Sequence, residues 1–503
     1  MHAEGNVLRL RRLGIDTYRE PVIYMSRDCP VCRSEGWVAQ ARVEVSGDGG
    51  TLIATLNVLT GDILRPDEAS LSDVAWAMIG ARDGDLVTLS HPRPVDSVSH
   101  VRAKAYGATL SEQQIRAVID DVGAGRYSAI ELAAFVTACA GGRVTLDETI
   151  ALTRAMVDVG ERLSWGRAPI VDKHSVGGLP GNRTTMIVVP IVTALGAVMP
   201  KTSSRAITSP AGTADAMETV APVALDLAAI RRVVEREGGC IAWGGAVQLS
   251  PADDVIITVE RPLDLDSDGQ LVASVLSKKL AAGSTHVVID MPVGPTAKVR
   301  SDEAARTLAH RLVATGDALG LRVRVVQGDG RQPIGRGIGP ALEARDVLAV
   351  LRSESGAPED LKARALTLAG EVLELAGIAA EGGGTDAAAR ALASGAALRK
   401  FEAICEAQGG FREPPRARFT QVVKAPAAGR LATIDNRRLA RVAKLAGAPG
   451  APAAGVELHV PLGAEVSAGQ RLFTVHAESP GELAYAIAFT EASPHILTIE
   501  VPA

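Results

Sequence analysis

Short apolar segments separated by Gly, Asp and Pro occupy the first part of the chain. Segments of this kind, with turn-forming residues between them, are typical of short β-strands. The four clearest segments are Val7–Arg11, Ala39–Val45, Leu52–Val58 and Asp85–Ser90. The pattern therefore predicts a small β-rich domain over residues 1–95.

From Ser111 onward, the apolar residues recur at helical spacing. Three segments show this spacing, and each has a Ser or Asp near its start, as helix N-termini usually do. They are Glu112–Val122, Ala129–Ala140 and Asp147–Arg162. We expect a helical domain over residues 96–168 that has no obvious chemistry of its own and suits a dimer interface.

Strand-like and helix-like segments alternate from Ile170. Alternation of this kind favours a parallel α/β sheet, whose binding sites lie at the ends of its strands. The strand candidates are Pro169–Val171, Ala197–Met199, Cys240–Trp243, His286–Asp290 and Arg322–Gln327. We assign residues 169–353 to this α/β domain.

The last part of the chain changes character twice. Residues 354–418 contain helical segments broken by glycine and proline runs, and we interpret them as a helical connection. Residues 419–503 are β-rich again and are expected to form an α+β C-terminal domain. Within them, Val460–Val475 resembles a hammerhead fold of the biotinyl type, but the Met-Lys-Met that would carry biotin is absent. A swinging-arm carrier is therefore excluded, and the expected fold class is a multidomain α/β protein.

Composition and charge limit the classes of function. With 503 residues the chain is too long for a single core, and with 3% aromatic residues its cores must be aliphatic. The net charge of −5 gives no reason to expect a nucleic acid partner, so any anion-binding site must be local. No secretory signal opens the chain, and no run of about eighteen apolar residues could span a bilayer. We expect a cytoplasmic protein without a membrane partner.

The five cysteines are scattered, which fits a reducing compartment better than a disulfide framework. Only Cys29-Pro-Val-Cys32 has metal or redox spacing. A zinc site needs two further ligands, and no second C-x-x-C or nearby H-x-H motif supplies them. A redox role would need a thioredoxin-like β-α-β context, which the turn-rich surroundings do not show. The sequence therefore favours a structural or incidental role for this pair and predicts no metal site.

Two polar stretches, Asp172–Asn182 and Lys201–Asp215, carry the candidate chemistry. Each follows a short apolar run, leads into an apolar helix-like segment, and offers glycines, hydroxyls and a cation. Glycine allows close backbone approach to a ligand, and the free N–H groups at a helix start favour an anion. Lysine adds a point charge, and Ser and Thr hydroxyls add directed donors. Two such stretches at one site would hold a phosphate beside the imidazole of His174.

These residues resemble the signature of the thymidine phosphorylase family of pyrimidine nucleoside phosphorylases. The signature is Lys-His-Ser-x-Gly-Gly in the first stretch and Ser-Ser-Arg-x-x-Thr-x-x-x-Gly-Thr-x-Asp-x-x-Glu from Ser203 to Glu218. A third element, Ala273–Lys279, resembles the base-contacting helix of the family, and a fourth, Gly339–Asp346, resembles its N/P-A-L-E-x-R-E stretch. The N-terminal extension and the longer first loop with Pro180 resemble those of archaeal AMP phosphorylases, and classical bacterial thymidine phosphorylases lack the extension.

The resemblance implies a pentosyltransferase, in which phosphate attacks C1′ of a nucleoside while the C1′–N bond breaks. The phosphate ligands that it implies are Lys173, Ser175, Thr185, Ser203 and Thr213. An alternative is that Thr185 and Ser203 are helix N-caps. For the leaving base, His174 is the first candidate proton donor, because an ordinary imidazole has a pKa near 6.5. Asp266, with Asp264 beside it, is the rival donor that the AMP phosphorylase branch implies.

Further residues are implied as nucleoside or nucleotide contacts. They are Gly178, Ser204, Arg205, Ala206, Ile207, Thr208, Ser209, Ser274, Lys278 and Lys298. Ser274 and Lys278 lie four residues apart, which places them on one face of the predicted helix. The chain departs from the pyrimidine enzymes at Val259, where their pattern has an arginine; Arg261 follows two residues later. Loss of that bidentate donor would weaken recognition of uracil or thymine.

The leading hypothesis is a phosphorylase that converts thymidine and phosphate to thymine and 2-deoxyribose 1-phosphate. The alternative is a phosphorylase of nucleoside 5′-monophosphates such as AMP, which would give the base and ribose 1,5-bisphosphate. A related fold such as anthranilate phosphoribosyltransferase is a further possibility, but the paired acids of its magnesium–diphosphate site are missing after these stretches. A non-catalytic protein would be expected to lack Lys173 or His174, and both are present. We expect no cofactor, inorganic phosphate as co-substrate, and a homodimer or higher homo-oligomer.

Overall fold

The computed structural model describes residues 6–206, 209–247, 249–263, 265 and 267–501. Contacts within the chain divide it into two compact units. The first unit comprises residues 1–106 with 120–135, and the second comprises residues 107–119 with 136–503. The domain boundaries expected from the sequence follow a different division and stay predictions.

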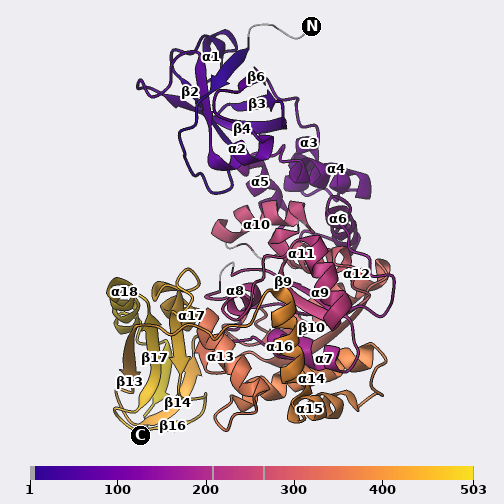
Figure 1. The fold of residues 1–503 in the computed structure, drawn as a ribbon, viewed down its shortest axis with the longest axis vertical. Coiled ribbons are helices and arrows are strands. Elements are labelled where there is room, and N and C mark those ends of the chain that lie inside the picture. Colours follow the sequence, from indigo (N-terminus) through magenta and orange to yellow (C-terminus); the bar gives the residue numbers. More distant parts are fainter. Residues whose placement is uncertain (1–5, 207–208, 248, 264, 266, 502–503) are drawn as a thin grey trace. The chain divides into compact units, whose positions relative to one another are not determined.

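The first unit contains a closed β-barrel with the strand order β1-β5-β2-β4-β3-β6 (Figure 1). Its strands are β1 (Val7–Leu10), β2 (Val22–Ser26), β3 (Arg42–Gly47), β4 (Gly50–Leu59), β5 (Glu68–Leu71) and β6 (Leu86–Ser90). Its helices are α1 (Pro30–Ser34), α2 (Asp73–Ile79) and α3 (Val98–Ala105). The four strands expected from the sequence overlap β1, β3, β4 and β6, so the β-rich character of this part is confirmed.

Strands β2 and β5 are not predicted by the sequence pattern. Each is buried along its whole length, so neither shows the alternation that marks a half-exposed strand. Strand β5 also contains Glu68, a residue type that usually lies on the surface. Glu68 is buried because Arg65 pairs with its carboxylate at 2.8 Å and also donates its backbone N–H to it at 2.9 Å.

Helices α4 (Glu112–Gly123), α5 (Ala129–Cys139) and α6 (Leu146–Asp158) lie where the helical spacing predicts them. Helix α6 begins with a capping box, in which Thr145 and Glu148 each accept a hydrogen bond from the other's backbone N–H. The other carboxylate oxygen of Glu148 accepts from the backbone of Leu110 at 2.8 Å. Helix α6 packs against α11 (Asp268–Ala281), which anchors it on the α/β part of the second unit.

The α/β part of the second unit is built on parallel strands, which confirms the predicted sheet. The strands are β7 (Val171–Ser175), β8 (Met199–Ser203), β9 (Gly239–Trp243), β10 (His286–Val293) and β11 (Arg322–Asp329). Strands β11, β10 and β7 form one sheet, β8 and β9 form another, and a parallel bridge between Ile170 and Val198 joins them. The other helices are α7 (Thr185–Ala194), α8 (Thr213–Glu218), α9 (Leu227–Glu237), α10 (Pro251–Leu263), α12 (Asp302–Ala318), α13 (Pro340–Leu351), α14 (Glu359–Leu375), α15 (Gly384–Ala393) and α16 (Ala396–Gln408).

Strands β7 and β8 continue further than the sequence pattern predicts. The pattern ends them at Val171 and Met199, because the residues that follow are polar. In the structure, the polar segments Asp172–Ser175 and Lys201–Ser203 belong to the strands, since their charged side chains are buried in ion pairs. The residues with candidate chemistry therefore begin inside the sheet and not in loops.

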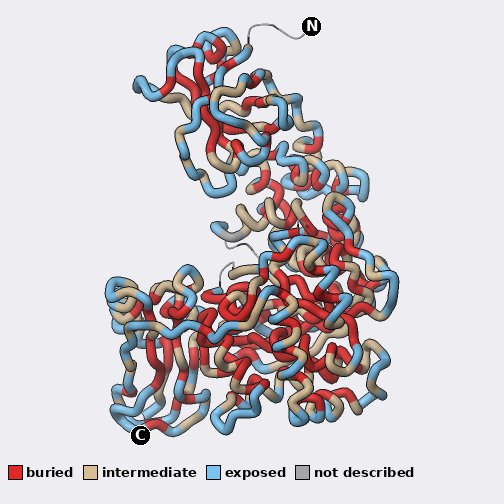
Figure 2. Tube along the Cα trace, in the orientation of Figure 1, coloured by how far each residue is buried: buried red, intermediate tan, exposed pale blue. Residues whose placement is uncertain are grey.

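Helix α7 lies in the main core of the second unit, and every residue from Thr185 to Thr193 is buried. It packs against α14 and α16, and Figure 2 shows the buried residues gathered in this part of the chain. A helix without a polar face must be covered on all sides. Because α7 follows the first polar stretch directly, this core holds the end of that stretch in place.

The C-terminal part consists of two antiparallel sheets, with the strand orders β12-β15-β17-β13 and β16-β14-β18. Its elements are β12 (Gly337–Ile338), β13 (Phe419–Lys424), β14 (Gly429–Ile434), α17 (Asn436–Leu445), β15 (Gly455–Leu458), β16 (Glu465–Val466), β17 (Arg471–Ala477), α18 (Pro480–Glu491) and β18 (Leu497–Glu500). Strand β12 precedes α13 in the chain and pairs with β15, so the C-terminal sheet is tied to the α/β part.

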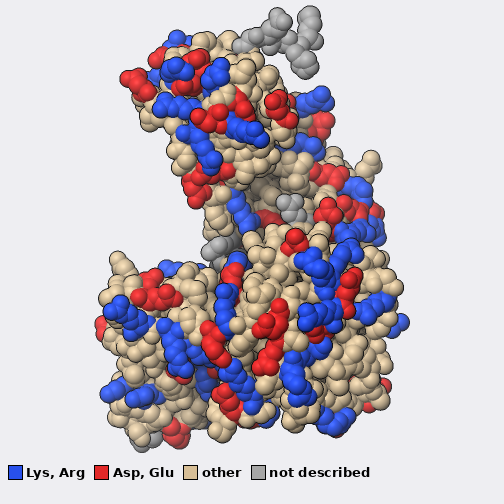
Figure 3. Space-filling model, in the orientation of Figure 1, with Lys and Arg blue, Asp and Glu red and all other residues tan. Residues whose placement is uncertain are grey.

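The charge on the surface and the length and polarity of the helices are relevant to possible partners. On the face shown in Figure 3, basic and acidic side chains are interspersed, as the small net charge leads us to expect. Within the described part of the chain, every helix is too short or too polar to cross a membrane.

Candidate active site

Lys173 lies in β7 and is fully enclosed, with 1% of its side chain exposed. Its ammonium donates to the hydroxyl of Thr184 at 2.7 Å and lies 3.5 Å from a carboxylate oxygen of Asp290. Lys173 is therefore not a solvated surface lysine. Burial lowers the pKa of Lys173 to about 8, although Asp290 opposes this effect. The ammonium is mostly protonated at neutral pH and contacts the N-cap residue of α7.

Asp290, in β10, holds the first polar stretch together. Its carboxylate accepts from Asn182 Nδ2 at 2.8 Å and from Arg364 Nε at 3.0 Å. Asn182 also donates to the hydroxyl of Ser175 at 3.3 Å. Burial alone would raise the pKa of Asp290, but the charges of Lys173 and Arg364 lower it, so the carboxylate is ionised.

Arg183 joins the two polar stretches. Its guanidinium donates to the hydroxyl of Thr213 at 2.9 Å and to the carbonyl of Ala211 at 3.0 Å. The same guanidinium forms a buried ion pair with Glu343 in α13. Glu343 belongs to the fourth sequence motif and also accepts from the backbone of Gly339 at 3.0 Å. One arginine thus connects the first stretch, the second stretch and α13.

The second stretch folds back on itself before α8, whose first residue is Thr213. The carboxylate of Asp215 accepts from the backbone of Ala206 at 2.6 Å and of Gly212 at 2.8 Å. A Cβ atom at Gly212 would lie 2.6 Å from the backbone nitrogen of Ala206. The loop therefore needs glycine at this position for a steric reason.

Arg205 is engaged by protein groups on several sides. Its guanidinium pairs with Glu218, pairs with Asp215 at 3.2 Å, and lies 4.8 Å from the ring centroid of Trp243. The hydrogen bond with Glu218 raises the pKa of Arg205, so the guanidinium stays charged. Ser204, beside it, is exposed. Arg205 therefore stabilises the shape of the second stretch.

A second buried ion cluster lies on the other face of β7. Asp172 contacts the ammonium of Lys201 at 3.0 Å and that of Lys279 at 2.7 Å, and all three side chains are at most 4% exposed. Burial raises the pKa of Asp172 and the two lysines lower it, and the lysines prevail. Burial also lowers the pKa of Lys279 to about 7. Since two lysines share one carboxylate, the cluster has a net positive charge below about pH 7 and favours an anion nearby.

His174 lies on the same face of β7 as Asp172 and is half-buried. Burial, followed by the charges of Lys279 and Lys201, lowers the pKa of His174 well below its usual value. The imidazole is therefore neutral at pH 7 and carries one N–H donor and one acceptor nitrogen. This differs from the sequence-based expectation of an imidazole that titrates near neutrality, because the sequence does not show which lysines surround it.

Ser274 and Lys278 lie on one face of α11, as their spacing predicts. The Lys278 ammonium donates to the Ser274 hydroxyl at 3.0 Å and pairs with Asp253 of α10 at 2.5 Å. Both Ser274 and Lys278 are half-buried. Val259, at the position where the pyrimidine enzymes have an arginine, is a buried aliphatic residue of α10.

Gly178 and Lys298 lie next to each other. A Cβ atom at Gly178 would be 2.3 Å from the backbone nitrogen of Lys298, so the first stretch packs directly on the segment after β10. Both residues are exposed. Ser209, also exposed, donates its hydroxyl to the carbonyl of Ala211 at 2.9 Å.

The structure places the expected phosphate ligands on neighbouring elements. Ser175 and Ser203 end the contacting strands β7 and β8, and Thr185 is the first residue of α7. The N-cap of α7 is Thr184, and Ser203 belongs to a strand, so neither Thr185 nor Ser203 is a helix cap.

Some expected residues cannot be placed. The candidate acid Asp266, its neighbour Asp264, and the candidate nucleoside contacts Ile207 and Thr208 lie outside the described residues. Within the described residues, no group of three or more His, Cys, Asp or Glu side chains is arranged to hold a metal ion.

The charged and amide residues that hold the site in shape are not predicted by the sequence pattern. They are Asn182, Arg183, Lys279, Asp290, Glu343 and Arg364. Four of these residues could have been suspected from the sequence, because they lie within the quoted motifs or directly after one of them. No sequence pattern indicates Asp290 or Arg364, since each is distant in sequence from the residues that it contacts.

Three family models match the chain. The models described as the helical bundle domain and the a/b domain of a glycosyl transferase family match residues 98–160 and 167–398, respectively. The model described as the pyrimidine nucleoside phosphorylase C-terminal domain matches residues 430–496. The helical and α/β parts thus match one family, and the C-terminal part matches a more specific one.

Individual proteins agree with these matches. A protein of Polaromonas sp. (strain JS666) named "Putative thymidine phosphorylase" is 66% identical over 96% of this chain and 94% of its own length. A protein of the same name from Hahella chejuensis is 59% identical over 99% of this chain and 98% of its own length. The aligned regions therefore include most of the first unit.

Among solved structures, anthranilate phosphoribosyltransferase from Thermus thermophilus has a similar fold, with a TM-score of 0.51 and 23% identity. The similarity covers 61% of this chain and 98% of that chain. The shared architecture of the two enzyme classes, expected from the sequence, is thereby confirmed. The relatives and the three matched models together show that this chain belongs to the thymidine and pyrimidine nucleoside phosphorylase family and is a pentosyltransferase.

Proposed function

We propose that the enzyme cleaves thymidine by phosphorolysis, giving thymine and 2-deoxyribose 1-phosphate. The observation that carries the proposal is the hydrogen bond from Arg183 to Thr213, which connects the two polar stretches at the ends of the contacting strands β7 and β8. The connected stretches offer hydroxyls and a buried cation, as phosphate binding requires. The names of the relatives support thymidine as the nucleoside.

In this proposal, phosphate binds where β7, β8 and α7 meet. The hydroxyl donors are Ser175, Thr185, Ser203 and Thr213, and Lys173 supplies the charge. The positive end of the α7 dipole adds to the attraction for an anion. A phosphate dianion beside Lys173 would raise the pKa of its ammonium above the value of about 8 in the free enzyme. Above that pH, phosphate binding therefore takes up a proton.

The reaction joins a phosphate oxygen to C1′ while the C1′–N bond breaks, and the base leaves with the electron pair. Negative charge then develops on the base, so donors directed at its oxygens lower the barrier. His174 offers a neutral N–H, and Lys278 offers an ammonium that Asp253 orients. We assign the base-carbonyl hydrogen bond to His174 and keep Asp266 as the candidate proton donor to the base.

The wall of the base site distinguishes thymidine from its alternatives. Because Val259 is aliphatic and buried, recognition of thymine must depend on Ser274 and Lys278. The alternative substrate, a nucleoside 5′-monophosphate such as AMP, would need a cation for its 5′-phosphate. Lys298, exposed beside Gly178 of the first stretch, is the candidate for that contact.

The test is phosphate-dependent release of base from thymidine, uridine, cytidine, adenosine, AMP and CMP, followed side by side by chromatography. We expect thymine to appear only when phosphate is present, together with an equal amount of 2-deoxyribose 1-phosphate. Release of base from the monophosphates alone would mean that the substrate is a nucleoside 5′-monophosphate, while the reaction would still be phosphorolysis. If none of the six compounds released base in a phosphate-dependent way, the phosphorylase proposal would be wrong.

We further propose that the helical domain provides a dimer interface, that the C-terminal domain has a hammerhead-like fold, and that the enzyme works in the cytoplasm without a cofactor. The two orders of antiparallel strands in the C-terminal part are compatible with such a fold. Analytical ultracentrifugation of the full chain tests the assembly, and a species with the monomer mass at all concentrations would contradict it.

A further inference from the structure

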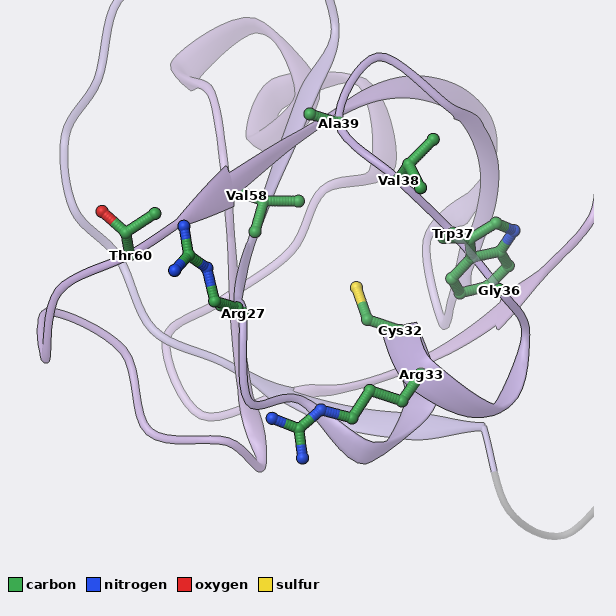
Figure 4. Close-up of a pocket in the computed structure, with 9 residues that line it drawn as sticks. All are labelled: Arg27, Cys32, Arg33, Gly36, Trp37, Val38, Ala39, Val58 and Thr60. Atoms are coloured by element: carbon green, nitrogen blue, oxygen red, sulfur yellow. The ribbon is translucent and has the colours of Figure 1, made fainter.

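The first unit contains a cavity of about 500 Å³ (Figure 4). Cys32, Arg27, Arg33 and Trp37 are among the residues that line it, and Figure 4 shows the Cys32 sulfur directed into the space between the lining residues. All residues that line the cavity belong to the first unit, whereas all residues of the proposed phosphorolysis site belong to the second. None of the residues assigned to phosphorolysis above lines the cavity.

Cys32 forms a close pair with Cys29 at helix α1. Cys29 is the residue before Pro30, the first residue of α1, and both thiols are free and buried. Cα atoms one helical turn apart fall within the range of about 4.4–6.8 Å that a disulfide spans. A bond between the two sulfurs therefore requires only small side-chain movements.

The two sulfurs are not equivalent to ordinary buried thiols. The hydrogen bond with the Cys32 thiol lowers the pKa of Cys29 to about 6, although burial opposes this effect. Backbone N–H groups of Cys32 and Val31 add to the lowering. By contrast, burial raises the pKa of Cys240 and of Cys405 to about 12. The hydrogen bond with Cys29, together with burial, raises the pKa of Cys32. At neutral pH the pair therefore holds one proton on Cys32, and Cys29 is the thiolate, which is the reactive form of a cysteine.

Two arginines line the cavity beside this pair. Arg33 is paired with Asp28. No hydrogen bond or ion pair of the Arg27 guanidinium occurs within the described residues, and this side chain is exposed. Trp37 is fixed by its indole N–H, which donates to Nδ1 of His91 at 3.1 Å. The cavity is thus lined by the buried Cys32 and by an uncompensated cation, a combination that suits a small disulfide with negative charge.

We propose that Cys29 and Cys32 form a thiol–disulfide exchange site that reacts, through this cavity, with small disulfides that carry carboxylates. Cys32 passes its proton to the Cys29 thiolate and attacks one sulfur of the small disulfide, whose S–S bond breaks, and the first small thiolate leaves and takes up that proton. Cys29 then attacks the Cys32 sulfur of the mixed disulfide, releases the second thiol and closes the Cys29–Cys32 bond. The pair loses two electrons and its one shared proton, and the second small thiolate takes up its proton from water. Arg27 attracts the carboxylates of the incoming molecule.

The sequence favours an incidental role for this pair because it shows neither the cavity nor the arginine. A thioredoxin-like β-α-β context is also not required by the chemistry. Exchange needs an accessible sulfur, a second thiol within bonding reach, and a fraction of thiolate at the working pH. In the barrel, Cys32 lines the cavity, and Cys29 supplies the second sulfur and the thiolate.

The experiment uses the full chain, incubated in mixtures of oxidised and reduced glutathione, quenched with acid, alkylated and mapped by mass spectrometry. We expect an internal Cys29–Cys32 disulfide that is lost again in excess reduced glutathione. Cys29→Ser should stop at a glutathione adduct on Cys32, whereas the core variant Cys405→Ser should behave like the wild type. The proposal is wrong if both cysteines of the folded wild type remain alkylatable in oxidised glutathione alone.

The ligand class is tested separately with Arg27→Gln and with two disulfides, oxidised glutathione and the uncharged hydroxyethyl disulfide. Loss of one partly solvated charge should slow the glutathione reaction by about fivefold and leave the hydroxyethyl disulfide reaction unchanged. Arg33→Gln is the matched control, and it should have a smaller effect because Asp28 already neutralises Arg33. Equal slowing of both disulfides by Arg27→Gln, or of neither, would overturn the preference for anionic disulfides.

Discussion

The guanidinium of Arg183 donates to the hydroxyl of Thr213 at 2.9 Å, across 30 positions in the sequence. Arg183 directly follows the first polar stretch, and Thr213 lies in the second. A buried ion pair with Glu343 fixes the arginine from its other side. The placement of the proposed phosphate hydroxyls therefore depends on a residue that belongs to neither the phosphate ligands nor the nucleoside contacts.

Replacement of Arg183 by methionine should raise the KM for phosphate at least tenfold and lower the free energy of unfolding by about 3–5 kcal/mol. The loss of stability follows because Glu343 would remain buried without its partner. The double variant with Glu343→Gln removes that buried charge, so it should regain stability but not phosphate affinity. Urea unfolding and steady-state kinetics measure the two effects. Recovery of the phosphate KM in the double variant would show that Arg183 does not position the loops.

Lys173→Ala should reduce phosphorolysis mainly through the phosphate KM, because this buried ammonium is the proposed charge at the start of α7. Isothermal titration with inorganic phosphate checks the same effect without turnover. Lys362→Ala is the control, since Lys362 has only a surface pair with Glu359 at 3.3 Å. An unchanged phosphate KM in Lys173→Ala would mean that the phosphate site is assigned wrongly.

His174→Ala is expected to lower kcat by about a hundredfold, the usual size of a lost proton-transfer or donor contribution. Because the pKa of His174 lies well below 6.5, kcat should show no step near pH 6.5 that depends on this residue. His174→Asn, which keeps a neutral N–H donor, should retain more activity than His174→Ala. A kcat close to that of the wild type in both variants would show that His174 does not stabilise the leaving base.

The free energy of unfolding should increase with pH through Lys279. Its pKa is about 7 in the folded chain, whereas an unfolded lysine has a pKa near 10.4. Between these values the unfolded chain binds more protons, so deprotonation favours the folded state, and this gain is absent below about pH 7. Lys279→Met should flatten this part of the profile. Urea unfolding of both proteins at pH 6.5, 8 and 9.5 provides the comparison, and parallel profiles would contradict the prediction.

The order of strands and helices in the α/β part could be predicted because its cores are aliphatic and its connections contain clear breaks. The ends of β7 and β8 could not, since polar residues such as Asp172 and Lys201 normally mark a loop. They remain in strands because each is neutralised by a partner distant in sequence, and periodicity carries no information on such partners.

Contacts between residues distant in sequence also limited what could be predicted of the candidate site. The hydroxyls and glycines of the two stretches could be named from the sequence, and Ser274 and Lys278 share a helix face as expected. The protonation of His174 could not be predicted, because it depends on Lys279 and Lys201, which lie on different elements. The role of Asp290, which holds Asn182 and Arg364, likewise appears only when three separate segments are placed together.

Helix α7 is buried along nearly its whole length, and its first turn lies at the proposed phosphate site. Backbone amides in such a helix exchange with deuterated water only when the surrounding structure opens globally. We expect them to be among the slowest amides of the second unit and to be little affected by phosphate. An end that is already rigid loses little conformational entropy when an anion arrives, so most of the attraction can appear as affinity.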